Sequence, residues 1–132
     1  MTIHAAVWLD HEQAKIFFFS PDTYGESDFD APKHRFASHA KGRDTHHRGG
    51  SSDQKEFFET IAKPLAGADE ILVLGPGTAK TQFLKHVHKH GPSLEARIVG
   101  VESADHPSPG QIVAHARQYF RAKDALLGAS SG

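Results

Sequence analysis

The sequence has 132 residues, a length that favours one domain with a single hydrophobic core. Fifteen Lys and Arg against sixteen Asp and Glu leave a net charge of −1, so the overall charge does not indicate a nucleic-acid binder and any basic surface must be local. The absence of cysteine excludes disulfides, Cys-containing zinc sites and thiol catalysis. Early charged residues and the lack of any apolar run of ~20 residues predict no signal peptide, no membrane span and a cytoplasmic protein.

The N-terminal part of the chain is rich in residues that favour strands. Residues 3–10 and 14–20 are short apolar runs separated by a polar turn, which predicts an antiparallel hairpin. Trp8 is expected in the core. The acidic stretch 21–32 is rich in turn-forming residues and is predicted to be a solvated loop that leads to a third strand near residues 34–38.

The sequence after Gly50 changes to a helical pattern. Ser51 is expected to cap this helix, because Gln54 follows three residues later as in a capping box. A helix end or kink is predicted near Pro64. The predicted buried face consists of Phe57, Phe58, Ile61, Ala62 and Leu65.

Two further strands and two further helices follow in alternation. Residues 70–75 form a nearly continuous apolar run, typical of a strand covered on both faces, and a second strand is predicted at 95–102. The final helix is predicted to begin with Ser108 as its cap and Pro109 in its first position, closed by Gln111. The helix between the two strands should bury Phe83, Leu84 and Val87, and the final helix should bury Ile112, Val113, Ala116, Tyr119 and Phe120.

The predicted order of elements is β-β-β-α-β-α-β-α. This order favours an α/β fold in which an antiparallel three-strand meander continues into parallel crossovers, giving a mixed five-stranded sheet with helices on its faces. Residues 1–124 are predicted to form the single domain, and residues 125–132 are predicted to be a flexible C-terminal tail.

Basic residues gather immediately before the first helix. Residues 33–48 contain five Lys or Arg and four His against the single carboxylate of Asp44, and two glycines follow. A basic Gly-Gly loop at 39–50 could bring backbone N–H groups and cations close to phosphates, although a solvated connector explains the same composition. The candidate RNA-binding residues are Lys41, Arg43, His46, His47, Arg48, Gly49, Gly50 and Ser51.

The stretch "GPGTAKT" suggests an anion-binding turn before the second helix. Gly75, Gly77, Thr78 and Lys80 are the candidate residues, but their spacing fits neither a Walker loop nor a dinucleotide-binding motif. A tight strand-to-helix turn with Thr78 as N-cap is the favoured interpretation, with an anion at the start of the helix as the alternative.

The eleven histidines raise the question of a metal site. His86 and His90 are separated by one helical turn, but no H-E-x-x-H motif and no cysteine accompanies them, so they are weak metal candidates. No dedicated metal site and no cofactor is predicted. A metal-dependent nuclease would need converging carboxylates, for which Asp10, Glu102 and Asp105 are the candidates.

Several of these motifs together resemble the middle domain of archaeal and eukaryotic class I peptide-release factors and of Pelota. The resemblance rests on Arg48-Gly49-Gly50, the following helix and apolar strand, and the turn with Gly75, Pro76, Gly77, Lys80 and Phe83. It covers most of the chain and extends to small bacterial relatives described as translational machinery proteins. It implies an RNase H-like fold and a translation-associated protein with the ribosome, tRNA or rRNA as partner.

One departure from the release-factor pattern bears on activity. Ser51 stands where the release factors have the glutamine of the Gly-Gly-Gln motif, which in that family takes part in hydrolysis of peptidyl-tRNA. The prediction is therefore an accessory protein that binds RNA without catalysis. The alternative is a hydrolase acting on peptidyl-tRNA or RNA, through a rebuilt loop or a metal-dependent site. Self-association through the sheet edge, near the aromatic residues 17–19, is a further hypothesis.

Overall fold

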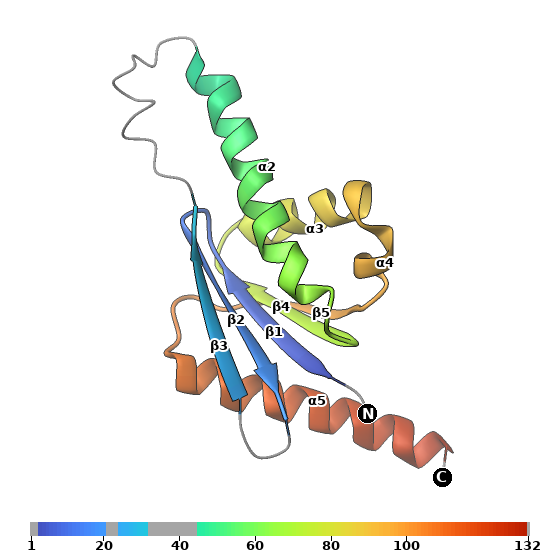
Figure 1. Cartoon of the computed structure of the whole chain (residues 1–132). Helices are drawn as coiled ribbons and strands as arrows, with labels where there is room; N and C mark the ends of the chain where they lie inside the picture. Colours follow the sequence, from blue (N-terminus) through green and yellow to red (C-terminus); the bar gives the residue numbers. More distant parts are fainter. Residues whose placement is uncertain (1–2, 21–23, 32–44, 132) are drawn as a thin grey trace.

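The computed structural model describes residues 3–20, 24–31 and 45–131, with residues 45–53 and 124–131 described by their backbone alone. A five-stranded sheet of order β3-β2-β1-β4-β5 forms the centre (Figure 1). The strands are β1 (His4–Leu9), β2 (Gln13–Phe19), β3 (Tyr24–Asp30), β4 (Glu70–Gly75) and β5 (Ile98–Ser103). The helices are α2 (Thr45–Leu65), α3 (Ala79–His90), α4 (Pro92–Glu95) and α5 (Pro109–Ser131).

The sheet is mixed, as predicted. β1 pairs antiparallel with β2, and β2 pairs antiparallel with β3, whereas β1, β4 and β5 run parallel to one another. The predicted RNase H-like arrangement of an antiparallel meander followed by parallel crossovers is therefore confirmed. No helix among the described residues is both long and apolar enough to cross a membrane.

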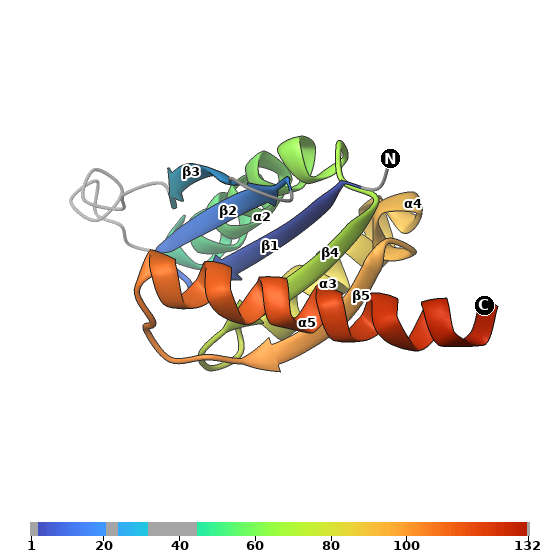
Figure 2. The same ribbon diagram turned by 90° about the horizontal axis from the view of Figure 1, so that it is seen from below.

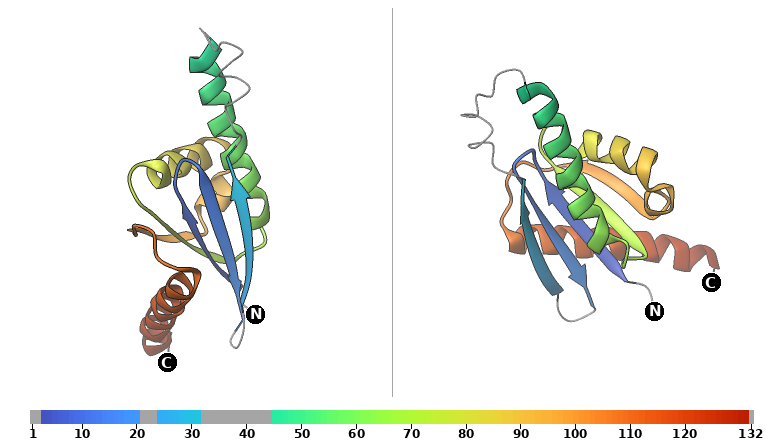
Figure 3. Two further views of the ribbon diagram at one scale, coloured as in Figure 1. Left: turned by 90° about the vertical axis from the view of Figure 1, so that its left-hand side faces the viewer. Right: turned by 45° about the horizontal axis from the view of Figure 1, so that its top comes forward.

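Helices cover both faces of the sheet. α2 and α3 lie on one face, and α5 crosses the other (Figures 2 and 3). β4 shows the consequence at the level of single residues: Ile71 and Val73 are buried toward α2 and α3, while Leu72 and Leu74 are buried toward α5. The prediction of a strand covered on both faces is confirmed.

Trp8 connects the central strand to the chain beyond β5. Its side chain is 2% exposed, and its indole Nε1–H donates to the carbonyl oxygens of Ala104 at 3.1 Å and Asp105 at 3.0 Å. A buried indole normally finds such a partner. The expected core position of Trp8 is confirmed.

The prediction for the acidic stretch was wrong. Residues 24–30 form the edge strand β3 instead of a loop, and the strand predicted near residues 34–38 lies outside the described residues. All β3 side chains except Phe29 are exposed, so the strand lacks the apolar alternation that would reveal it. Its backbone pairs with β2 along its whole length, and Lys15 of β2 lies 3.9 Å from Glu26 and 3.8 Å from Asp28.

The two edges of the sheet are β3 and β5. Carboxylates on β3 crowd one another: a side-chain hydrogen bond with Asp28, followed by burial, raises the pKa of Glu26. Charged residues on an edge strand disfavour pairing with another sheet. Self-association through the sheet edge stays a prediction.

The capping box at the start of α5 is confirmed. Gln111 N–H donates to Ser108 Oγ at 3.2 Å, and Ser108 N–H donates to Gln111 Oε1 at 2.8 Å. The helix α5 continues to Ser131, into the predicted tail at 125–132, and the flexibility of that tail stays a prediction. Once a helix is nucleated, each added residue gains a backbone hydrogen bond, and no proline interrupts this stretch.

The strand predicted at 95–102 begins later, at Ile98, because Pro92–Glu95 form the short helix α4. The pairing of β4 with β5 is irregular between Ile71 and Leu72, where Leu72 lies opposite Gly100. Tyr119 accounts for the lack of a side chain at position 100. The Tyr119 hydroxyl donates to the Val99 carbonyl at 2.9 Å, and a Cβ on Gly100 would lie 2.3 Å from that hydroxyl oxygen.

Gly75 sits where β4 turns toward α3, at φ +156°. Its replacement by alanine should lower the free energy of unfolding by about 3 kcal/mol, because the overpacked methyl group cannot be accommodated without a backbone shift. The new Cβ would lie 2.1 Å from the Leu9 carbonyl oxygen. Urea unfolding measures the loss.

Gly77 provides the matched control for this substitution. It has φ +61°, and no atom lies within 4 Å of the position that an added Cβ would take, so Gly77→Ala should cost only about 1 kcal/mol of conformational strain. Equal losses for the two variants would contradict the close approach of β1 to Gly75.

Candidate nucleic-acid interface

The predicted basic Gly-Gly loop at 39–50 is helical in its second half. Lys41 and Arg43 lie outside the described residues, whereas residues 45–50 form the first turns of α2. Ser51 is therefore inside the helix and is not its cap. Two adjacent glycines disfavour a helix by about 1 kcal/mol each relative to alanine. The packed part of α2 supplies the nucleus from which the helix propagates back through them.

α2 has two parts with different surroundings. Its C-terminal part packs on the sheet, and its N-terminal part projects past the sheet, on the side where β1 ends (Figure 1). The predicted buried face is confirmed at Phe57, Phe58, Ile61 and Leu65, which are all buried, with Ala62 partly buried. The predicted end near Pro64 is also confirmed, since the helix ends at Leu65.

Phe58 joins α2 to α3. Its ring centroid lies 5.5 Å from that of Phe83 in an edge-on arrangement and 5.7 Å from the imidazole of His86. Phe58 itself is only 4% exposed. The outer surface along this contact is a groove of about 450 Å³, lined by Gln54, Lys55, Phe58, Gln82, Lys85, His86, Lys89 and His90.

The groove is basic. No Asp or Glu occurs between Glu70 and Glu95, so α3 carries its lysines and histidines with no carboxylate of its own. Lys85 and Lys89 are separated by one helical turn and are exposed, as is Lys55 across the groove. Within the described part of the chain, none of these three lysines takes part in an ion pair. Their charges are therefore available to an anionic partner.

Gln54 adds an unsatisfied polar atom to the same groove. Its Oε1 is buried and has no hydrogen-bond partner among the described residues. A buried acceptor in this state costs about 1–3 kcal/mol.

The imidazole of His86 is partly enclosed between the two helices. Burial lowers its pKa from the ordinary value of 6.5, and the neighbouring charges of His90 and Lys55 lower it further, while Glu59 acts in the opposite direction. The rings of His86 and His90 have centroids 4.7 Å apart. The neutral form of His86 is therefore favoured at neutral pH.

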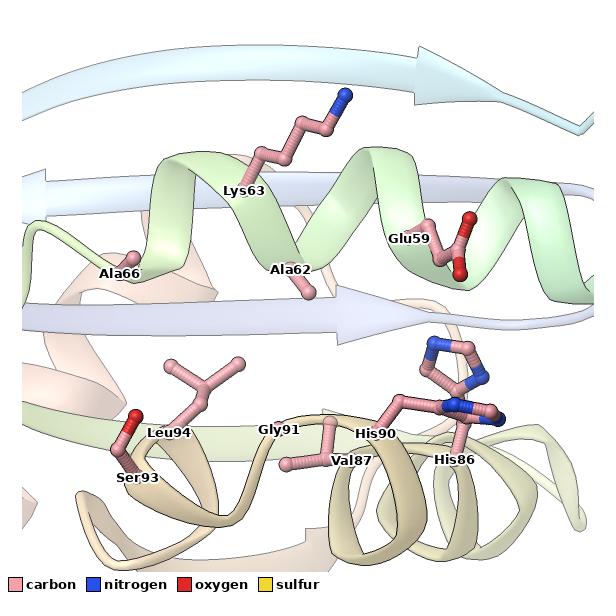
Figure 4. Close-up of a pocket in the computed structure, with 10 residues that line it drawn as sticks. All are labelled: Glu59, Ala62, Lys63, Ala66, His86, Val87, His90, Gly91, Ser93 and Leu94. Atoms are coloured by element: carbon pink, nitrogen blue, oxygen red, sulfur yellow. The ribbon is translucent and has the colours of Figure 1, made fainter.

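A second hollow lies on the other side of these imidazoles, between α2, α3 and α4 (Figure 4). Its volume is about 480 Å³. Figure 4 shows Glu59 on α2 facing the imidazoles of α3, with Leu94 of α4 pointing up toward α2. Its lining consists of Glu59, Ala62, Lys63, Ala66, His86, Val87, His90, Gly91, Ser93 and Leu94.

The candidate anion-binding turn is closed on itself. Lys80 Nζ donates to the Gly77 carbonyl oxygen at 2.7 Å. Thr78 occupies the N-cap position of α3 but makes no side-chain capping hydrogen bond, because its ψ of −6° is helical instead of extended. The predicted N-cap position of Thr78 is confirmed, and anion binding at Gly75–Lys80 stays a prediction.

The carboxylates considered for a nuclease have other partners. Asp10 Oδ1 accepts the backbone N–H groups of Glu12 and Gln13, each at 2.8 Å. Glu102 pairs with His115. The imidazole of His106 contacts the other two carboxylates, with Nδ1 3.1 Å from Asp105 Oδ1 and Nε2 3.5 Å from Asp10 Oδ2. No group of three or more His, Asp or Glu in the described residues is arranged to hold a metal ion. His86 and His90 therefore belong to no such group among these residues.

Sequence reasoning missed Gln54, Lys55, Gln82, Lys85 and Lys89 as members of a site. Two features of the sequence point to part of this set: the absence of carboxylates between Glu70 and Glu95, and the helical spacing of Lys85 and Lys89. The approach of Lys55 to α3 depends on tertiary packing and has no counterpart in a sequence pattern.

Comparison with solved structures identifies the architecture. Pelota from Archaeoglobus fulgidus superposes with a TM-score of 0.63 at 16% identity, over 98% of this chain and 34% of that one. The chain has a Pelota-like domain fold. Pelota from Thermoplasma acidophilum gives a TM-score of 0.55 at 22% identity, over 83% of this chain and 30% of that one. The archaeal translation termination factor aRF1 gives 0.57 at 14% identity, over 98% and 42%.

The Pelota-like fold is shared at the level of architecture. The chain spans between 30% and 42% of the length of these three structures. No protein-family model and no curated protein matches the sequence. The predicted resemblance to a domain of Pelota and release factors is therefore confirmed for the fold.

The lowered pKa of His86, at the contact between α2 and α3, predicts how the stability of the protein depends on pH. The folded protein binds fewer protons at His86 than the unfolded chain does between the lowered pKa and 6.5, so this residue makes stability fall as pH drops through that range. An NMR titration of the imidazole should give a pKa below 6.5, with the resonance assigned by its disappearance in His86→Gln.

The same variant tests the linkage to stability. The unfolding free energy of wild type should decrease more than that of His86→Gln when the pH is lowered from neutrality to below 6.5. A His86 pKa at or above 6.5, with identical pH dependence in both proteins, would contradict the enclosed position of this ring.

Proposed function

We propose that this protein is a translation-associated accessory protein that binds ribosomal RNA or tRNA through the groove between α2 and α3. The observation that carries the proposal is the carboxylate-free face of α3, which joins Lys55 of α2 to form a basic surface on a chain of net charge −1. Exposed lysines that lack ion-pair partners are the groups that neutralise phosphates, and their effect depends on salt through counterion release.

RNA accounts for the groove better than a simple anion does. Phosphate oxygens can accept from Lys85 and Lys89, and the side-chain amides of Gln54 and Gln82 that line the groove can both donate and accept. The 2′-hydroxyl of ribose is both a donor and an acceptor, and it is the group that distinguishes RNA from DNA. The Pelota-like fold, shared with a translation termination factor, directs the proposal toward RNAs of the translation machinery.

The basic residues ahead of the groove extend the proposed surface. Lys41, Arg43, His46, His47 and Arg48 precede or begin α2, whose N-terminal part projects past the sheet. We propose that these residues, with Gly49, Gly50 and Ser51, also contact RNA. Because Ser51 replaces the glutamine of the release-factor motif, the proposed role is binding without peptide release.

Ribosome co-sedimentation at low and physiological salt tests the groove. Lys85→Gln together with Lys89→Gln should weaken pelleting and reduce the slope of log K against log salt by about 1.4, for two lost single-strand phosphate contacts. The control is Arg121→Gln with Lys123→Gln, which removes two charges from α5 on the opposite face of the sheet, one of them paired with Glu70 at 3.6 Å. Pelleting that is independent of salt, or weakened equally by both pairs, would contradict the proposal.

A second variant separates the groove from the preceding segment. Lys41→Ala, Arg43→Ala and Arg48→Ala together should also weaken salt-sensitive pelleting, and combining them with the groove pair should weaken it further, since distant phosphate contacts add. Unchanged pelleting of this triple variant would confine binding to the groove and remove the segment from the proposal.

A further inference from the structure

The basic groove and the second hollow of about 480 Å³ are neighbours with opposite character. His86 and His90 line both of them. Lys55, Lys85 and Lys89 stand on one side. The other side combines the aliphatic side chains of Val87 and Leu94 with the polar side chains of Glu59, Lys63 and Ser93. A ligand that is anionic at one end and has a flat, largely apolar group with polar edges at the other would therefore fit both hollows.

We infer that the second hollow, between α2, α3 and α4, receives one unpaired base of single-stranded RNA while the adjoining phosphates lie on the lysines of the groove. This inference rests on the proposed function, because it names the form of RNA that the same surface binds.

The floor of the hollow suits a flat apolar ring. Val87 is 1% exposed and Leu94 is 7% exposed, and Ala62 of α2 offers only a methyl group above them. The volume lies within the range of about 300–1,000 Å³ found for small-molecule sites. Small side chains on α2 thus leave room where larger ones would close the contact between the helices.

The polar groups of the rim are Glu59, Lys63 and Ser93, and the Lys63 side chain points away from the hollow in Figure 4. Glu59 presents a carboxylate that can accept from base amino or imino groups, and Ser93 presents a hydroxyl. A carboxylate repels phosphate, so Glu59 also fixes the orientation: the base enters the hollow, and the phosphate stays on the side of Lys85 and Lys89.

The two imidazoles form the wall between base and phosphate. Their centroids lie 4.7 Å apart, and His86 also contacts the ring of Phe58. Aromatic side chains, including histidine, stack on unpaired bases in RNA-binding proteins. A base in a duplex is stacked on both faces and paired through its Watson–Crick edge, so it cannot enter such a hollow. The site should therefore select single strands.

The experiment measures fluorescence anisotropy of the full chain with three labelled probes: a short single-stranded RNA, the same RNA as a duplex, and the single strand with abasic riboses. Wild type should bind the base-bearing single strand most tightly. Ala62→Leu and Ser93→Phe, which fill the hollow from α2 and α4, should each weaken that binding about tenfold and leave abasic binding unchanged.

Ala114→Leu, at an exposed position on α5, is the matched control for added apolar volume and should bind all three probes as wild type does. Urea unfolding of each variant verifies that it is folded. If the filled variants bind the base-bearing strand as well as wild type, the base site is overturned while RNA binding by the groove stands. If they weaken base-bearing and abasic strands equally, the hollow holds no base.

Failure of the proposed function would give a different binding result. Wild type would then bind none of the three probes, even at low salt, and the loss would be independent of the hollow. Binding that favours the duplex over the single strand would also overturn the base site, because the groove alone would then account for the contact.

Discussion

The parallel pairing of β1 with β4 is the contact on which the remaining structure depends. It joins the antiparallel meander to the parallel half of the sheet, and it requires a glycine at 75 because the backbone of Leu9 passes too close for any side chain. Residues of both strands are buried on both faces, so two separate helical layers must cover them. One layer, α2 with α3 and α4, creates the groove and the hollow, and α5 covers the opposite face of the sheet.

Charge is distributed unevenly over the surface. Exposed carboxylates lie on the edge strand β3, where Lys15 partly balances them, while α3 has none. A chain close to neutrality can therefore present a local basic surface without being a basic protein. The enclosed His86 lies at the boundary between this surface and the apolar hollow, and the packing that lowers its pKa is the same packing that shapes both cavities.

Much of the fold could be predicted because its elements carry strong local patterns. The apolar run of β4, the buried face of α2 and the capping box at Ser108 and Gln111 each follow from residue type and spacing. β3 could not be predicted, because an edge strand exposed on nearly every side chain has no apolar periodicity. The extension of α2 through Gly49 and Gly50 opposes local preference and follows from propagation of a packed helix. Within the candidate site, the spacing of the lysines on α3 can be seen in the sequence. The approach of Lys55 and Gln54 to α3 depends on tertiary packing and cannot.

The most direct measurement is an NMR titration of the isotopically labelled protein with a short single-stranded RNA, followed through backbone amide shifts. The account predicts perturbations at Lys55, Gln82, Lys85 and Lys89 of the groove that diminish as salt is raised, with β3 and α5 unaffected. Perturbations centred on α5 or on the β3 edge, or none at low salt, would contradict the claim that the contact between α2 and α3 is the RNA-binding surface.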